Sequence, residues 1–279
     1  MPRRICRLTV AGSRRFVTVG VAVFVAACSI SRQREVEIGA VYAKQIDAEL
    51  PVVRDAAITN YLQRLGDSLA TIADTRGLTW HFALINWSDV NAFALPGGWV
   101  YVTRGLVARA DSMEMLAGVL GHEISHVTRR HAVKQAEKAQ KANVGVSIAC
   151  VLTGACEHVL TQIGIEVTGQ AVFAKYSRDD EKEADEDGVR LVIHAGISPL
   201  GVPRMLQKLL DERKTQPGGV DAWFRSHPYE EERIAYTKLL IDRQFKDRPN
   251  ALPLLTRDTP LFREFRDRVG KLPPAQKAK

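Results

Sequence analysis

The stretch that most constrains the fold is His122-Glu-Ile-Ser-His126, because it places two imidazoles and a carboxylate within little more than one helical turn. At about 100° per residue, positions four apart differ by roughly 40°, so His122 and His126 lie on one helix face and can bind one metal ion. Glu123 stands beside them, where a carboxylate does not ligate the metal but reaches a water held on it. The motif therefore predicts a metal site with its own base.

The residues around this motif predict a buried helix from about 112 to 141. Asp111-Ser-Met-Glu114 has the pattern of a capping box, and an apolar face follows at Met115, Leu116, Val119, Leu120, Ile124 and Val127. Buried histidines and a buried glutamate need partners, and zinc supplies them; the alternative is a pair of core histidines held by hydrogen bonds. His131 lies five residues beyond His126 and faces elsewhere, so we expect it behind the ligands or on the surface.

Composition indicates one globular domain without a nucleic-acid partner. The 279 residues are 46% hydrophobic and 25% charged. The net charge is +7, but five arginines and no acid lie in the first 27 residues, which leaves +2 for the rest. A nearly balanced chain shows no electrostatic footprint for a polyanion.

The N-terminus has the pattern of a bacterial lipoprotein signal peptide, residues 1–27. The apolar run from Phe16 to Ala27 gives about 18 Å of helix, too short for a hydrocarbon core of ~30 Å. Val25-Ala-Ala-Cys28 resembles the lipobox, so we expect cleavage before Cys28, lipidation there and a tether over residues 28–34. An ordinary secreted protein and an uncleaved anchor are the alternatives. Ser29 after the cysteine favours the outer membrane, with the domain facing the periplasm.

The spacing of apolar residues predicts an α+β fold that is mainly helical. A helix runs up to Pro51, and a second runs from Asp55 to about Ala73. Residues 79–87, 92–95 and 99–102 alternate like strands, with Pro96-Gly-Gly98 between the last two. We expect a small mixed or antiparallel sheet beside the metal helix, and a structural role for His81, which falls in the first strand.

The stretch from residue 143 to 174 is rich in Gly, Val, Ile and Ala, but no uncharged apolar span of about 20 residues can be drawn in it. It is either a core helix with a glycine-rich loop or a mobile apolar lid. Cys150 and Cys156 lie inside it, either as a disulfide or as two buried thiols.

A catalytic zinc site needs a third protein ligand, and residues 179–187 offer seven acids in nine positions. Ser177 before them fits a helix N-cap, and acids in a first turn favour the helix dipole, so most of them need no further role. Glu181 and Asp185 are four apart and share a face. One of them could bind the metal while the other orients a ligand histidine, and the spacing does not say which.

Four segments resemble a family of zinc metallopeptidases of gluzincin type, which contains the CAAX prenyl protease, HtpX, the mitochondrial Oma-type proteases and the periplasmic BepA. The matching segments are Asn91-Ala-Phe-Ala-Leu-Pro-Gly-Gly98, His122 to His126, Glu181-Lys-Glu-Ala-Asp185 after Tyr-Ser-Arg, and His227-Pro with Arg233-Ile. The resemblance implies one Zn²⁺ per chain, with His122, His126 and Glu181 as ligands, Glu123 as the catalytic base and Asp185 behind the ligands. It also implies that an extended substrate adds to an edge strand made of Asn91, Ala92, Phe93, Ala94 and Leu95.

His227 is expected near the metal by the same resemblance, either in its open position in a latent state or as a catalytic group that helps the transition-state oxyanion. From the residues alone, Pro228 fits the start of a helix, so Ser226 or His227 could be only an N-cap. Arg233 is implied as a charge near the site, or it lies on a helix surface. The domain is expected over residues 35–247 and a tail over 248–279, which matches the short, lipid-anchored members of the family.

The sequence therefore predicts a zinc-dependent endopeptidase, a metalloendopeptidase of the bacterial cell envelope that degrades misfolded or misassembled envelope proteins. The alternative is a binding factor for protein quality control or assembly whose zinc site is latent. A third hypothesis, a purely structural zinc, requires a closed four-ligand site and no activity. Oligomeric state is left open.

Overall fold

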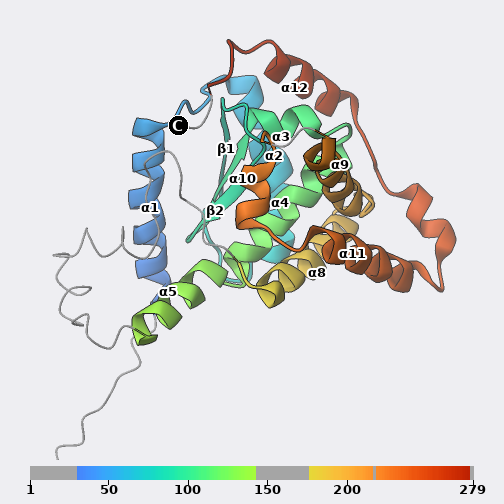
Figure 1. Ribbon diagram of the computed structural model, residues 1–279, viewed down its shortest axis with the longest axis horizontal. Helices are drawn as coiled ribbons and strands as arrows, with labels where there is room; N and C mark the ends of the chain where they lie inside the picture. The colour runs from blue at the N-terminus through green and yellow to red at the C-terminus, as the bar shows by residue number, and fades with distance from the viewer. Residues whose placement is uncertain (1–29, 143–175, 216–217, 277–279) are drawn as a thin grey trace, which may run out of the picture.

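The computed structural model describes residues 30–142, 176–215 and 218–276, and Figure 1 shows their arrangement. The described helices before residue 143 are α1 (Arg32–Glu49), α2 (Ala56–Ala73), α3 (Arg104–Arg109), α4 (Met113–Thr128) and α5 (His131–Ala142). After it come α8 (Arg178–His194), α9 (Gly201–Thr215), α10 (Asp221–Ser226), α11 (Glu230–Phe245), the 3₁₀ helix η1 (Pro249–Leu254) and α12 (Pro260–Gly270). With the strands β1 (His81–Ile85), β2 (Ala92–Leu95) and β3 (Trp99–Thr103), this confirms the mainly helical α+β class.

The sheet is mixed and has the order β1-β3-β2, so β2 lies at an edge as predicted. β1 runs parallel to β3, and β2 runs antiparallel to it. The β2–β3 turn contains Gly97 and Gly98 at φ 84° and 110°, values that favour glycine because a Cβ would clash. His81 is exposed and stacks on Trp99 with ring centroids 5.1 Å apart, a structural role.

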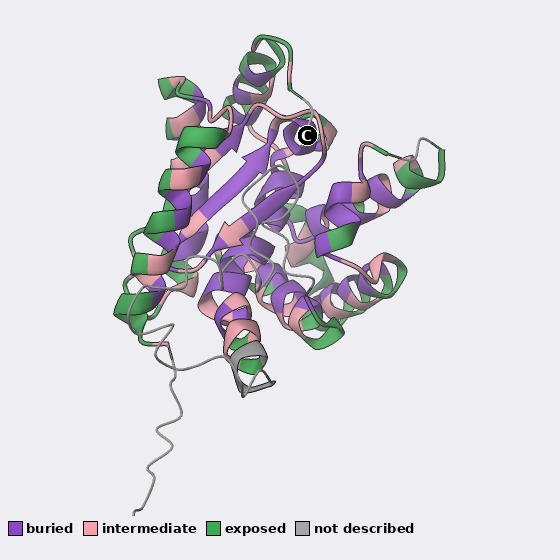
Figure 2. Ribbon diagram, turned by 60° about the vertical axis from the view of Figure 1, so that its left-hand side comes forward, coloured by how far each residue is buried: buried purple, intermediate pink, exposed green. Residues whose placement is uncertain are grey.

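Helices cover both faces of the sheet, because its strands alternate between two apolar clusters. Phe82, Leu84, Val100 and Val102 belong to the large cluster shared with α2 and α4. The residues that point the other way pack on α1 instead: Ile85, Phe93, Leu95 and Tyr101. Figure 2 shows the buried strands with α1 laid along them, its outer side exposed. The sheet is therefore held between α1 and the helix that carries the H-E-x-x-H motif.

The helix predicted from 112 to 141 is in fact two helices. Arg130, between α4 and α5, has φ 60°, a left-handed conformation that an arginine adopts at a cost of about 1 kcal/mol. Its guanidinium is fixed by Glu35 of α1, with Nε 2.7 Å from Oε2, and this contact stabilises the turn. A contact with a residue 95 positions away cannot be seen in helical periodicity, which is why the prediction was wrong.

The predicted capping box at the start of α4 is also absent. Ser112 is the N-cap, but its side chain makes no capping hydrogen bond. Instead, the amide of Met113 donates to Asp258 Oδ1 (3.2 Å) and that of Glu114 to the carbonyl of Arg257 (2.9 Å). The C-terminal segment thus satisfies the free amides of this helix.

Two glycines let α4 and α8 cross closely. A Cβ on Gly188 would lie 3.1 Å from the backbone nitrogen of His122, and one on Gly121 would lie 3.3 Å from the Cα of Gly188. α8 itself begins with a complete capping box between Ser177 and Asp180, which confirms the predicted N-cap. The crossing brings the acidic start of α8 against the histidines of α4.

The C-terminal residues are part of the folded domain, contrary to the expectation of a tail from residue 248. Phe262 and Phe265 of α12 are buried, and Phe265 stacks on Tyr61 of α2 with ring centroids 4.4 Å apart. The sequence marks α12 only by these apolar positions and the capping Thr259 before Pro260. The segment folds because this apolar face covers α2.

No helix in the described ranges is long and apolar enough to cross a membrane. Cys28, the signal peptide, the stretch 143–174 and its Cys150 and Cys156 lie outside the described residues.

Candidate metal centre

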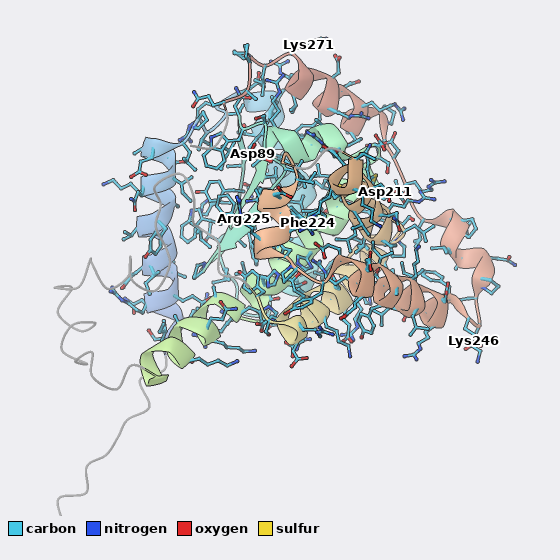
Figure 3. The ribbon with its side chains drawn as sticks, viewed as in Figure 1. Asp89, Asp211, Phe224, Arg225, Lys246 and Lys271 are labelled. Carbon is cyan, nitrogen blue, oxygen red and sulfur yellow. The ribbon has the colours of Figure 1, made fainter. Side chains whose placement is uncertain are left out.

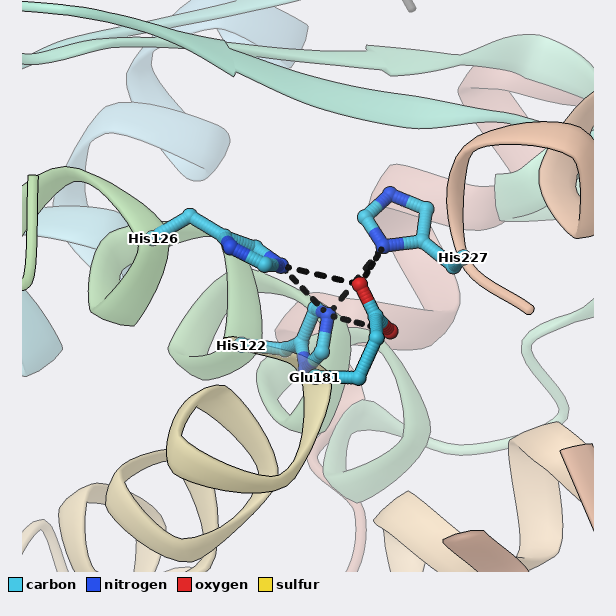
Figure 4. A group of neighbouring side chains, drawn as sticks. All are labelled: His122, His126, Glu181 and His227. Atoms are coloured by element: carbon cyan, nitrogen blue, oxygen red, sulfur yellow. Dashed lines mark hydrogen bonds and ion pairs between the residues drawn. The ribbon is translucent and has the colours of Figure 1, made fainter. Parts of the chain in front are cut away.

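Four buried side chains from three parts of the chain meet at one point (Figure 4). His122 and His126 come from α4, Glu181 from the first turn of α8, and His227 from the residue after α10. One possible ligand atom from each lies within 4.8 Å of the other three, and each residue is at most 2% exposed. The structure thus brings together all three residues expected to bind zinc, with His227 beside them as the resemblance implied.

The remaining acids of the 179–187 run stay out of the centre. Only Glu181 and Asp185 are buried among them, each 1% exposed, because they occupy the face of α8 that crosses α4. Asp185 does not reach the ligand group. Its Oδ1 lies 2.9 Å from Nδ1 of His122, which fixes the ring with its proton on Nδ1 and its lone pair on Nε2.

His131 plays the equivalent part for His126. The two Nδ1 atoms are 2.8 Å apart, and Nε2 of His131 lies 3.3 Å from Oε2 of Glu183. A proton on Nδ1 of His126 satisfies this chain of contacts and leaves its Nε2 free to bind. His131 is fully buried, so of the two places expected for it the structure selects the one behind the ligands.

The donor set fits a zinc ion. With the protons of both rings on Nδ1, Nε2 of His126 and Nε2 of His122 each carry a lone pair, and these two atoms are 3.0 Å apart. Two lone pairs at this distance repel each other unless a cation lies between them. Nδ1 of His227 lies 3.2 Å from Nε2 of His122 and 3.2 Å from Oε1 of Glu181. Ligand atoms about 2.0–2.1 Å from a tetrahedral zinc are separated from one another by roughly 3.3–3.4 Å. The spacing found here is close to that value.

Arg233 of α11 neutralises the two acids. Its Nη1 lies 2.6 Å from Oε2 of Glu181, while Nε and Nη2 each lie 2.8 Å from an oxygen of Asp185. Burial alone raises the pKa of both carboxyls, but the charge of Arg233 outweighs it and holds both pKa values below their usual range. Both acids are therefore ionised, as metal binding and histidine orientation require. The alternative of a helix-surface Arg233 is excluded, since it is 5% exposed.

Among the residues that the structure describes, Glu123 is the one acid at the centre without a hydrogen bond. It is fully buried, and neither carboxylate oxygen has a hydrogen-bond partner within the described ranges. Burial raises its pKa above the usual value. Nε2 of His227 lies 3.4 Å from Oε1 of Glu123, so the histidine stands between the base and Glu181. Burial lowers the pKa of His227, but Glu181 and Glu123 outweigh it and raise the pKa overall.

Two aromatic residues that the sequence reasoning missed hold the histidines in place. Tyr176 stacks on His126 with ring centroids 3.8 Å apart and planes 16° apart, and Trp223 of α10 stacks on His227 at 4.6 Å and 29°. The sequence signals for Tyr176 are its place directly before the N-cap of α8 and in the Tyr-Ser-Arg of the family resemblance, neither of which predicted this contact. Figure 3 shows α10, with Phe224 and Arg225 labelled, in front of α4. His227 is the C-cap of this helix, so the N-cap alternative is wrong.

The edge strand borders the centre, as expected. Ala94 and Leu95 of β2 line the same pocket as His126 and Tyr176. Asn91, just before β2, is 1% exposed, and its side-chain amide has no hydrogen-bond partner among the residues described.

The geometry agrees with a comparison against family models, in which residues 56–239 match the model of peptidase family M48. The chain belongs to this family of zinc metallopeptidases. The match spans α2 to α11 and so includes the whole metal centre. The resemblance to this metallopeptidase family is thereby confirmed, and zinc is its metal.

Several curated relatives carry protease names. The beta-barrel assembly-enhancing protease of Escherichia coli (strain K12) is 30% identical over 223 residues, 75% of this chain and 44% of that protein. The protein of the same name from Yersinia pestis is 31% identical over 235 residues, 81% of this chain and 47% of its own length. Metalloprotease YcaL of E. coli is 35% identical over 184 residues, 63% of this chain and 69% of that protein. The chain thus spans less than half of the first two relatives.

Proposed function

We propose that this M48 family member is a zinc-dependent endopeptidase in which His122, His126 and Glu181 hold the metal and Glu123 is the base. The observation that carries this proposal is the Glu123 carboxylate beside the ligand group, which is fully buried and has no hydrogen-bond partner in the part of the chain that the structure describes. Leaving a buried acid unsatisfied costs stability, so a role in chemistry accounts for it better than packing. A purely structural zinc would not need this carboxylate.

Each residue has a distinct part in the proposed reaction. When bound, zinc supplies Lewis-acid polarisation of the attacking water and of the scissile carbonyl. Glu123 takes the proton of that water and returns it to the leaving amine, for which its raised pKa is suited. Asp185 and His131 keep the lone pairs of the two histidines on Nε2.

We further infer that His227 closes the site in this conformation. Its Nδ1 stands among the other possible ligand atoms, so a bound zinc would be held by His122, His126, Glu181 and His227 together, without an open position for water. An active state then requires His227 to leave. This arrangement also supports the second candidate, a quality-control or assembly factor that binds proteins while its zinc site is latent.

Substrate and location are proposals that extend the names of the relatives. A protease named for enhancing β-barrel assembly suggests misfolded or misassembled envelope proteins as substrates. We propose that such a chain adds in extended form to the edge strand β2, beside His126. The lipobox-like sequence at Cys28 supports lipid anchoring on the periplasmic side of the outer membrane.

The decisive experiment compares casein cleavage by the wild type, Glu123→Gln and His227→Ala, with the zinc content of each. Loss of cleavage in Glu123→Gln with zinc retained is expected, because loss of a general base costs about 10²–10⁴-fold. Faster cleavage by His227→Ala supports a latch, whereas a loss of 10²–10³-fold indicates a group that stabilises the oxyanion. Zinc without cleavage in all three proteins would refute the endopeptidase and leave the binding factor.

A further inference from the structure

The segment that carries His227 shares few backbone contacts with the rest of the domain. We call residues 218–227, which contain α10, the α10 segment. Among the described residues, two backbone hydrogen bonds link it to the rest of the chain: the amide of Val90 donates to Gly219 (2.8 Å), and the amide of Tyr176 donates to Ser226 (3.4 Å). Trp223 pack into the apolar core with its neighbours, but apolar packing is not directional. Polar side-chain contacts must therefore fix where His227 stands.

The chain turns sharply after the α10 segment. Tyr229, two residues beyond His227, has φ 71°, a left-handed conformation that is unfavourable for a residue with a bulky side chain. Such a conformation persists only where surrounding contacts hold it. Tyr229 directly precedes Glu230, the first residue of α11, so a contact at the start of α11 also fixes the turn after His227.

Arg213 of α9 contacts both ends of this part of the chain at once. Its Nη1 lies 2.6 Å from Oε1 of Glu230, at the start of α11, and its Nε lies 3.7 Å from Oδ1 of Asp221, the first residue of α10. Between the two acids the guanidinium lies over the ring of Phe224, with Cζ 4.7 Å from the ring centroid. Figure 1 shows α9 beside both helices. One side chain thus bridges the acids on either side of His227.

α9 gives these contacts a firm base, but the contacts themselves lie at the surface. Met205, Leu206 and Leu209 are buried on the inner face of α9, each at most 2% exposed. The Arg213 side chain is 45% exposed. An ion pair at such a surface shifts an equilibrium by about five-fold at most. Arg213 therefore forms a reversible link between α9 and the α10 segment.

We propose that Arg213 is a positioning residue for His227: it links both ends of the α10 segment to α9 and so favours the closed site, in which His227 stands among the possible zinc ligands. This inference rests on the proposed endopeptidase and on the closing role of His227 within it. Loss of the Arg213 contacts shifts the population toward the open state, in which Nδ1 of His227 leaves its position for water.

The first test measures the zinc affinity of the purified full chain by competition with a chromophoric chelator. His227→Ala should bind zinc more weakly, because it removes one of the four possible donors. Arg213→Gln should bind zinc about two- to five-fold more weakly than the wild type, the range that an exposed ion pair can contribute. In the His227→Ala background the same substitution should change nothing, since no histidine is left to position. A merely structural role of Arg213 would lower the affinity in both backgrounds.

The second test follows the α10 segment directly, by hydrogen exchange of the zinc-loaded protein with mass spectrometry. The amide of His227 donates to the carbonyl of Trp223 at 2.9 Å, and in Arg213→Gln this and the other amides of α10 should exchange faster by a similar factor. Casein cleavage should rise in parallel. Glu230→Gln removes the partner at 2.6 Å and should show the same changes, and the two substitutions together should have less than the sum of their separate effects.

The matched control is Arg268→Gln. It breaks an ion pair between α12 and Asp55 in which the two side chains are 56% and 26% exposed. Neither residue belongs to the metal centre or to the α10 segment. Zinc affinity, exchange of the α10 amides and casein cleavage should therefore all remain at the wild-type level.

The outcomes separate this inference from the function beneath it. The positioning role is refuted if Arg213→Gln and Glu230→Gln, with normal melting temperatures, change neither zinc affinity nor α10 exchange. It is also refuted if Arg213→Gln weakens zinc binding equally in the His227→Ala background, or if it slows casein cleavage. If the wild type cleaves no casein while zinc affinity and exchange respond as expected, the endopeptidase fails and the positioning role stands.

Discussion

Replacing Arg233 by methionine tests the electrostatic account of the metal centre. The substitution keeps an unbranched, apolar stem but removes three contacts of 2.6 to 2.8 Å with Glu181 and Asp185. Both acids are 1% exposed, so they cannot recover these contacts from water. In metal-free protein, two buried negative charges are then left without their principal cation.

The expected loss is large for a single residue. Breaking a buried ion pair by removing one partner costs about 3–5 kcal/mol. A domain of this size loses ≈ 2–4 °C of melting temperature per kcal/mol, so the melting temperature should fall by roughly 6–20 °C. The matched control is Arg34→Met, which breaks an Arg–Glu pair whose side chains are 51% and 47% exposed. Such an exposed pair contributes at most about 1 kcal/mol.

A second substitution identifies the cause. Asp185→Asn removes one of the two charges yet keeps an oxygen that can accept from Nδ1 of His122. Arg233→Met combined with Asp185→Asn should therefore be more stable than Arg233→Met alone, and the double variant should lose about 0.5–3 kcal/mol less than the sum of the two single variants. Thermal unfolding by circular dichroism in EDTA measures five proteins: the wild type, Arg233→Met, Asp185→Asn, the double variant and the Arg34→Met control.

Two results would refute this reasoning. One is an Arg233→Met protein that melts within about 2 °C of the wild type, a shift of no more than ~1 kcal/mol. The other is a double variant no more stable than Arg233→Met, which would mean that lost packing, and not the uncompensated charge, causes the destabilisation.

Three further predictions concern the parts around the ligands. Burial holds the pKa of His131 below its usual value of 6.5, so as the pH falls the unfolded chain binds a proton on this residue before the folded chain does. The contribution of neutral His131 to the free energy of unfolding is therefore complete above pH 6.5 and is lost as the pH falls toward the folded pKa. Urea midpoints between pH 7 and 5 should therefore fall less steeply in His131→Gln, and an equal slope would exclude this cause. Gly188→Val should reduce the zinc content and lower the free energy of unfolding by about 1–3 kcal/mol, because its Cβ would lie 3.1 Å from the backbone of α4. The control Gly270→Val, whose Cβ meets nothing within 4 Å, should keep its zinc. Adding zinc at 100 times its Kd should stabilise the EDTA-treated wild type by ≈ 2.7 kcal/mol, which scanning calorimetry measures. Glu123→Gln should gain the same stabilisation, and His126→Ala should not.

Some elements follow from local pattern alone. The helix expected from Asp55 to about Ala73 is α2 (Ala56–Ala73), and Asp55 caps it through hydrogen bonds to two amides. A 3.6-residue apolar period and a capping side chain both act within a few residues, so they can be read from the chain itself. The predicted ends of α4 failed because distant residues, Glu35 and Arg257–Asp258, make the contacts that define them.

The metal centre divides in the same way. The sequence by itself determined that His122, Glu123 and His126 share one helical turn, because a spacing of four residues is a property of the helix. The spacing left open which of seven acids joins the histidines, and the resemblance implied Glu181; the tertiary structure places Glu181 beside them by burying it and Asp185 opposite Arg233. It also brought His227 to the ligands, 105 residues beyond His122. Periodicity shows which side chains share a face, but what that face meets depends on close helix crossings such as Gly121 on Gly188, which no local pattern records.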